Sequence, residues 1–114
     1  MSNDLFLKII DREIPADIVY EDDQVLAFKD IEPQAPTHIL IIPKRRIATL
    51  NELEVEDLPL VGHMVGVAKD IAGSVGLDEA GYRLVFNCNE GGGQSVYHIH
   101  LHLLGGRQMT WPPG

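Results

Sequence analysis

The sequence predicts an antiparallel α+β domain, and three observations lead to that expectation. Five short segments are rich in strand-forming residues, one long segment has the spacing of an amphipathic helix, and strands and helices do not alternate regularly along the chain. A regular alternation would instead favour a parallel sheet. The length of 114 residues and the hydrophobic content of 45% suffice for one domain whose core needs no disulfide.

The N-terminal segment predicts a short helix followed by a hairpin. Residues 5–10, Leu-Phe-Leu-Lys-Ile-Ile, read as an amphipathic helix that ends before Pro15. Residues 18–20 and 25–28 consist of strand formers and flank the polar segment 21–24. Two such runs joined by a short polar connection are typical of a β-hairpin.

A third strand is predicted for residues 38–42, His-Ile-Leu-Ile-Ile. Pro33 and Pro36 break regular structure before it, and Pro43 stops it, because proline lacks the backbone N–H that a strand needs. Two further strands are expected at residues 82–87 and 98–104, joined by a glycine-rich loop.

One long helix is predicted for residues 55–75. Pro59 is tolerated only in the first turn of a helix, so the helix should begin near residue 55, and Gly76 suits its C-terminal cap. The apolar residues follow a spacing of three and four and form a wide face: Leu58, Val61, Val65, Ala68, Ala72 and Val75, widened by Leu60, Met64, Val67 and Ile71.

Composition bounds the partners and the compartment. The single cysteine, Cys88, excludes an internal disulfide, and residues 1–20 lack the features of a signal peptide, so the cytoplasm is the expected location. No segment approaches the length of a membrane span. The net charge of −8 disfavours nucleic acid and anionic membranes as partners, whereas a small anionic ligand in a local pocket stays possible.

The segment 98–104, His-Ile-His-Leu-His-Leu-Leu, places three imidazoles at every second position. Successive side chains of a strand point to opposite faces, so the three histidines share one face and the intervening apolar residues are buried on the other. Only five histidines occur in the whole chain. Their concentration here indicates chemistry more than packing.

Three interpretations of these histidines compete. In a strand His98 and His102 begin roughly 13 Å apart, so one metal ion cannot bind all three rings, although two of them with His38 or Cys88 would suffice for a site. A polar row on an exposed sheet face is the second interpretation. The third is nucleophilic and acid–base catalysis, in which a neutral imidazole attacks phosphorus and a histidine with an ordinary pKa near 6.5 supplies a proton.

The loop before the histidines favours catalysis on a phosphate. Residues 87–95, Asn-Cys-Asn-Glu-Gly-Gly-Gly-Gln-Ser, combine glycines that allow close backbone approach with amide donors and the Ser95 hydroxyl. Glycine-rich turns alone are more often simple hairpins. Directly upstream of three histidines, the loop predicts a phosphate site.

Segment 98–104 matches the signature of the histidine triad (HIT) family in full, and nearly the whole chain resembles its Hint branch, the histidine triad nucleotide-binding proteins. The triad ends in His102 and not in glutamine, which argues against the nucleotidyltransferase branch. Thr110 stands where some relatives carry another histidine. Further matching segments are Phe6, Lys8-Ile9-Ile10, Glu13-Ile14-Pro15, Phe28 to Ile31, Pro33 to His38, Gly81-Tyr82-Arg83, Gly92 to Tyr97, Leu104 to Arg107 and Trp111 to Gly114.

The resemblance implies a single HIT domain over residues 1–114, with one long and one short helix and a five-stranded antiparallel sheet continued across a homodimer. It implies hydrolysis of purine nucleoside phosphoramidates to the nucleoside monophosphate and amine, without a cofactor or a metal. A nucleotide-responsive binding protein and a zinc-binding protein stay open as alternatives.

The resemblance also implies roles for four histidines. His100 would attack the α-phosphorus and form a nucleotidyl-histidine intermediate. His98 and His102 would flank it, polarise phosphate oxygens and help protonate the amine, while His38 would support the relay from the neighbouring strand.

The predicted substrate contacts come from three parts of the chain. Asp30 would accept the ribose hydroxyls, although an aspartate before a proline-rich turn often only caps the turn. The apolar residues assigned to the base would otherwise be ordinary core residues. The base set is Phe6, Ile9, Phe28 and Ile31, and the phosphate-side set is Asn87, Gly93, Gln94 and Ser95.

Overall fold

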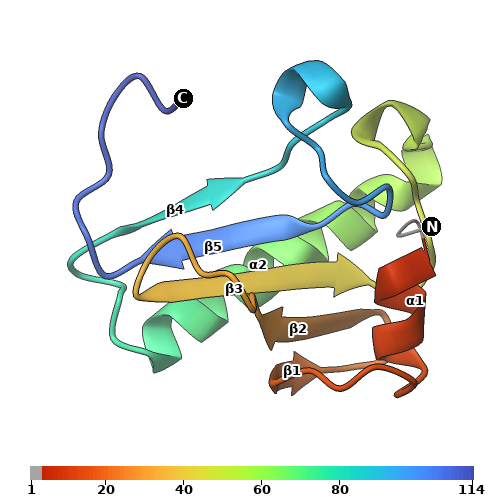
Figure 1. Ribbon diagram of the computed structural model, residues 1–114, viewed down its shortest axis with the longest axis horizontal. Helices are drawn as coiled ribbons and strands as arrows, with labels where there is room; N and C mark the ends of the chain where they lie inside the picture. The colour runs from red at the N-terminus through yellow and green to blue at the C-terminus, as the bar shows by residue number, and fades with distance from the viewer. Residues whose placement is uncertain (1–3) are drawn as a thin grey trace.

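The computed structural model describes residues 4–114, and its centre is one antiparallel sheet of five strands (Figure 1). The strand order is β1-β2-β3-β5-β4, so β1 and β4 form the edges. This confirms the predicted α+β class and the number of strands. The strands are β1 (Ile18–Glu21), β2 (Val25–Lys29), β3 (Thr37–Pro43), β4 (Tyr82–Val85) and β5 (Leu101–Gly105).

Two α-helices accompany the sheet, the short α1 (Leu5–Ile10) and the long α2 (Leu58–Ser74). The long helix begins three residues later than expected, because Val55–Asp57 form a separate 3-10 turn, η3. Its capping box joins Asp57 and Glu54, and Pro59 then lies in the first turn of α2. Gly76 follows the helix with φ of +81°, a conformation that glycine adopts without strain.

The two faces of the sheet carry separate apolar clusters. The helix α2 crosses one face (Figure 1), and α1 packs on the other face near the ends of β2 and β3. Only part of this second face is covered, which leaves room for a cavity. The cluster between α2 and the sheet includes Val25, Ala27, Ile39, Ile41, Met64, Val67, Ala68, Ile71, Ile99, Leu101 and Leu103, and the cluster between α1 and the sheet consists of Phe6, Ile9, Leu26, Phe28, Leu40 and Ile42.

The last strand begins at Leu101 and not at His98 as the sequence predicted. Residues 98–100 do not belong to the strand. The amide of Ile99 donates a hydrogen bond to the carbonyl of Ile47 in the β3–α2 connection. The predicted alternation nevertheless holds: Ile99, Leu101 and Leu103 are buried under α2. The histidines between them face the opposite side.

Two long connections hold each other in place at one end of the sheet. The side-chain amide of Gln94, in the β4–β5 connection, donates to the carbonyl of Ala48 at 2.7 Å. The guanidinium of Arg46 donates to the carbonyl of Tyr97 at 3.0 Å. These contacts position the chain that carries His98 and His100.

His63 on α2 was expected to be solvated, and it is instead partly buried against the β1–β2 turn. Its Nε2 lies 2.6 Å from Oδ2 of Asp22, which also accepts a hydrogen bond from Tyr20. The contact ties α2 to the hairpin. Over residues 4–114 none of the helices has the length and apolar character to span a membrane.

Candidate active site

Four histidine rings and one phenylalanine ring form a continuous row on the sheet face opposite α2. The ring centroids of His38 and His102 are 5.2 Å apart, and those of His102 and His100 are 4.9 Å apart. Phe6 from α1 meets His100 and His98 edge to face at 5.2 and 5.5 Å. Residues distant in sequence therefore build one site.

His100 is held with one ring nitrogen free. Its Nδ1 lies 2.9 Å from the carbonyl oxygen of His98. A carbonyl only accepts hydrogen bonds, so Nδ1 carries the proton and Nε2 keeps its lone pair. This is the state that a nucleophilic imidazole requires.

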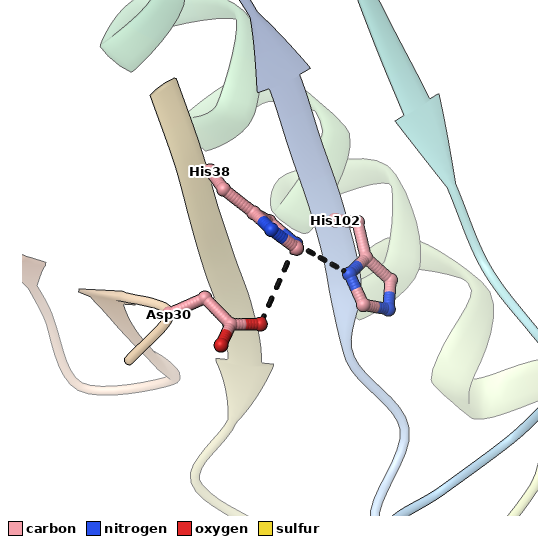
Figure 2. Close-up of side chains that lie close together, drawn as sticks. All are labelled: Asp30, His38 and His102. Carbon is pink, nitrogen blue, oxygen red and sulfur yellow. Dashed lines mark hydrogen bonds and ion pairs between the residues drawn. The ribbon is translucent and has the colours of Figure 1, made fainter. Parts of the chain in front are cut away.

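His38 and His102 form a directed pair (Figure 2). The backbone amide of Gln34 donates to Nδ1 of His38 at 3.0 Å, so the proton of His38 is on Nε2. That nitrogen lies 2.9 Å from Nδ1 of His102, which must accept, so the proton of His102 is on Nε2. This last N–H is buried and has no partner within residues 4–114, and Figure 2 shows it turned away from His38.

Burial keeps the site histidines neutral. Desolvation lowers the pKa of His38, His98 and His100 below the ordinary value of 6.5. Desolvation together with the neighbouring His100 and His38 lowers the pKa of His102 to about 4. The sequence predicted that a histidine with an ordinary pKa would supply a proton. The lowered pKa values instead make these rings neutral at pH 7, so they act through directed N–H groups and lone pairs.

His98 does not flank a cavity as its predicted role requires. It is fully buried, and its Nε2–H donates to the carbonyl of Pro43 at 2.7 Å. Its carbonyl accepts the Nδ1–H of His100. The geometry of His98 thus serves to orient His100.

A cavity of about 410 Å³ opens beside His100 and His102. Phe6, Ile9 and Phe28 are buried core residues and also form its wall, so both interpretations of these residues apply. Ile31 is different, because it is 91% exposed and stands at the rim. The volume and the mostly apolar wall are typical of a small-molecule site.

Asp30 lies on the wall of the same cavity, and its two carboxylate oxygens have different environments. Its Oδ1 accepts the amide of Glu32 at 2.8 Å and so caps the turn, as one interpretation proposed. Its Oδ2 lies 3.5 Å from Nε2 of His38. One carboxylate oxygen thus stays directed toward the site.

The four residues predicted for the phosphate side are not all on one wall. Ser95 lines the cavity beside His100, and Asn87 lines a second cavity on the other side of His102. Gly93 and Gln94 line neither. The Gln94 amide bonds the backbone of Asn89, Ala48 and Val96, so it shapes the loop.

Asp30, His38 and His102 bring three metal-ligating atoms within 4.8 Å of one another (Figure 2). The tautomers oppose a metal there. An ion on Nε2 of His38 needs a lone pair on that nitrogen and a proton on Nδ1, but Nδ1 already accepts the amide of Gln34. Cys88 is not part of this group.

The sequence did not predict two backbone groups that fix the tautomers of the histidines. The amide of Gln34 and the carbonyl of Pro43 select the tautomers of His38 and His98. Backbone groups have no side-chain signature, so only the proximity of Gln34 to His38 in the sequence hinted at the first contact. The second joins residues 55 positions apart.

Comparisons with known proteins agree with this fold and site. The profile of the HIT domain matches residues 11–109. The purine nucleoside phosphoramidase of Escherichia coli strain K12 is 59% identical over 105 residues, which are 92% of this chain and 88% of that protein. An uncharacterized HIT-like protein of Synechococcus elongatus is 60% identical over the full length of both chains.

Solved structures give the same result. A HIT family hydrolase from Legionella pneumophila superposes with a TM-score of 0.95 at 64% identity, covering 96% of this chain and 98% of that one. A HIT family hydrolase from Clostridium thermocellum superposes with a TM-score of 0.91 at 45% identity, covering 96% of each chain. The chain therefore belongs to the histidine triad family, which confirms the resemblance seen in its sequence.

Proposed function

We propose that this protein hydrolyses purine nucleoside 5'-phosphoramidates through a covalent nucleotidyl-histidine intermediate. The observation that carries the proposal is His100, whose Nδ1–H is fixed on a carbonyl while its free Nε2 belongs to a ring on the wall of a cavity of about 410 Å³. The 59% identity to the E. coli purine nucleoside phosphoramidase supports the same reaction class.

The reaction has two displacements at phosphorus. In the first, Nε2 of His100 forms a bond to the α-phosphorus and the phosphorus–nitrogen bond to the amine breaks. The amine leaves with the bonding electron pair and takes a proton from Nε2–H of His102, the buried donor that has no partner of its own within residues 4–114. In the second, the oxygen of a water molecule forms a bond to phosphorus and the bond between phosphorus and Nε2 of His100 breaks. One proton of the water returns to the deprotonated Nε2 of His102, and the hydroxyl stays on phosphorus in the released nucleoside monophosphate.

The purine nucleoside would occupy the cavity beside His100. Phe6, Ile9, Phe28 and Ile31 offer apolar contact to the base, and Oδ2 of Asp30 accepts a ribose hydroxyl. The hydroxyl of Ser95 and the amide of Asn87 would contact the phosphate from its two sides.

The active form is proposed to be a two-fold dimer in which the sheet continues across β4. The strand β4 lies at an edge of the sheet. Leu58 and Val65 on α2 and Val75 directly after it are 56%, 41% and 49% exposed. An unpaired edge and exposed apolar side chains both favour a partner. Sedimentation at micromolar concentration should give twice 12.6 kDa, and a monomer would reject the dimer.

Turnover tests the proposal. Purified protein incubated with adenosine 5'-phosphoramidate should release AMP and ammonia over many cycles. Tight retention of AMP without turnover would instead indicate a nucleotide-responsive binding protein. The protein is expected to act without a cofactor, nucleic acid or membrane, in the cytoplasm.

A further inference from the structure

A second cavity, of about 460 Å³, lies against the same pair of histidines. His38 and His102 contribute to both cavities, so the pair stands between them. The second cavity is lined on the β4 side by Arg83 and Asn87, and by Arg107 from the segment after β5. The nucleoside, assigned to the first cavity, leaves this space to another part of the substrate.

The two arginines of this cavity have no carboxylate partner in the part of the chain that the structure describes. Six of the nine lysines and arginines lie within 4.0 Å of a carboxylate. Over residues 4–114, the other three, Arg46, Arg83 and Arg107, have no such partner, although acidic residues outnumber basic ones by seventeen to nine. Within the described residues of one chain, the two guanidinium groups beside the candidate active site are thus not paired with a carboxylate.

Both guanidinium groups are partly fixed and still have donors to offer. Arg83 donates to the carbonyl of Thr110 at 2.9 Å, and Nε of Arg107 donates to the carbonyl of Gln34 at 3.0 Å. A guanidinium has five N–H donors in a planar fork that matches a carboxylate or a phosphate. Carbonyl contacts hold the side chains without cancelling their charge.

We infer that the second cavity receives the leaving group, and that Arg83 and Arg107 select amines that carry an anionic substituent. This inference rests on the proposed phosphoramidate hydrolysis and names its substrate class: nucleoside 5'-phosphoramidates of amino acids or of other amines that bear a carboxylate or a phosphate. His102, which supplies the proton in the proposed reaction, is one of the residues that line this cavity. The bond changes are those of the proposed reaction, and the anionic substituent takes no part in them.

The test compares adenosine 5'-phosphoramidates of glycine, of glycinamide and of aminomethylphosphonate. Glycinamide is the neutral counterpart of glycine, and the phosphonate separates a preference for phosphate from one for carboxylate. The quantity measured is the ratio of kcat/KM for each anionic substrate to that for glycinamide. Intrinsic differences between the amines cancel when this ratio is compared between wild type and a variant.

Arg83→Met should lower the glycine-to-glycinamide ratio about tenfold, because a charge-assisted hydrogen bond is lost. Arg83→Lys should keep part of the preference, since it keeps the charge. Lys8→Met removes one positive charge from the exposed side of α1 and should leave the ratio unchanged. In wild type the ratio should also fall with added salt, which tests the inference even if Arg83→Met does not fold.

Two failures are distinguishable. If wild type releases AMP from all three substrates, and neither salt nor Arg83→Met changes the ratio, the selection of anionic amines is wrong and the proposed hydrolysis stands. If no substrate is turned over, the hydrolysis itself is wrong, and this inference falls with it.

Discussion

Nε2 of His38 lies 2.9 Å from Nδ1 of His102, and this contact makes two histidines from different strands into one directed unit. The amide of Gln34 begins the chain, and the buried Nε2–H of His102 ends it. Each hydrogen bond selects the tautomer of the next ring. The neutral ring of His102 can therefore donate its Nε2–H at one fixed position without first becoming charged.

Replacement of the proposed nucleophile gives the most direct prediction. His100→Ala should abolish turnover of adenosine 5'-phosphoramidate while AMP still binds, because the proposed base and ribose contacts remain. Substitutions of His98 or His102 should leave measurable activity, since the bond-forming nitrogen is kept. Rapid quench with labelled substrate and peptide mapping should find an acid-labile adduct on His100.

His63→Ala is the matched control, because it removes a histidine that contacts Asp22 far from this row of rings. It should retain activity. A fully active His100→Ala, or an adduct mapped to His98 or Cys88, would end the proposed mechanism.

Asp30→Ala should weaken the binding of AMP by roughly 1 to 3 kcal/mol, since the ribose hydroxyls lose their acceptor. The binding of inorganic phosphate should be weakened far less. Asp30→Asn is a useful companion, because its oxygen can still accept the amide of Glu32 and cap the turn. Calorimetric titration measures both ligands, and equal weakening of AMP and phosphate would remove Asp30 from the ribose site.

The pH dependence of activity follows from the lowered pKa of His100. Desolvation favours the neutral ring, so the nucleophilic lone pair persists below pH 6.5. The value of kcat/KM should stay level from neutral pH through 6.5 and fall only on further acidification. A midpoint for this acid limb at or above 6.5 would contradict the burial argument.

Stability should depend on pH in the same direction. The pKa of His102 is about 4 in the folded chain and near 6.5 in the unfolded chain, so between these values the unfolded chain binds more protons. The stabilisation linked to the neutral ring of His102 should therefore be complete above about pH 6.5. The free energy of unfolding should fall as the pH drops from there toward 4. Urea titrations of wild type and His102→Gln measure this, and His102→Gln should show a smaller fall.

Metal removal should leave activity intact. Asp30, His38 and His102 are close enough for an ion, but the amide of Gln34 occupies the nitrogen of His38 that would have to carry a proton. Dialysis against EDTA should not change kcat/KM, and purified protein should contain much less than one zinc per chain. One tightly held zinc with activity lost in EDTA would favour the metal interpretation.

Local patterns in the sequence predicted the secondary-structure elements and the faces on which their side chains lie. Local periodicity is a property of neighbouring residues, so the spacing in segment 98–104 predicted that Ile99, Leu101 and Leu103 would be buried opposite the histidines. The same reasoning gave the positions of the five strands and of α2 to within a few residues. The family signature rests on the same contiguous residues.

The tautomers and the burial of the histidines depend on tertiary contacts. The burial of His98, the start of β5 at Leu101 and the placing of Arg83 and Arg107 on one cavity wall depend on contacts between distant segments. The tautomers of His38 and His98 depend on backbone groups of Gln34 and Pro43. Backbone hydrogen bonds and desolvation are set by the whole fold, so no local pattern encodes them.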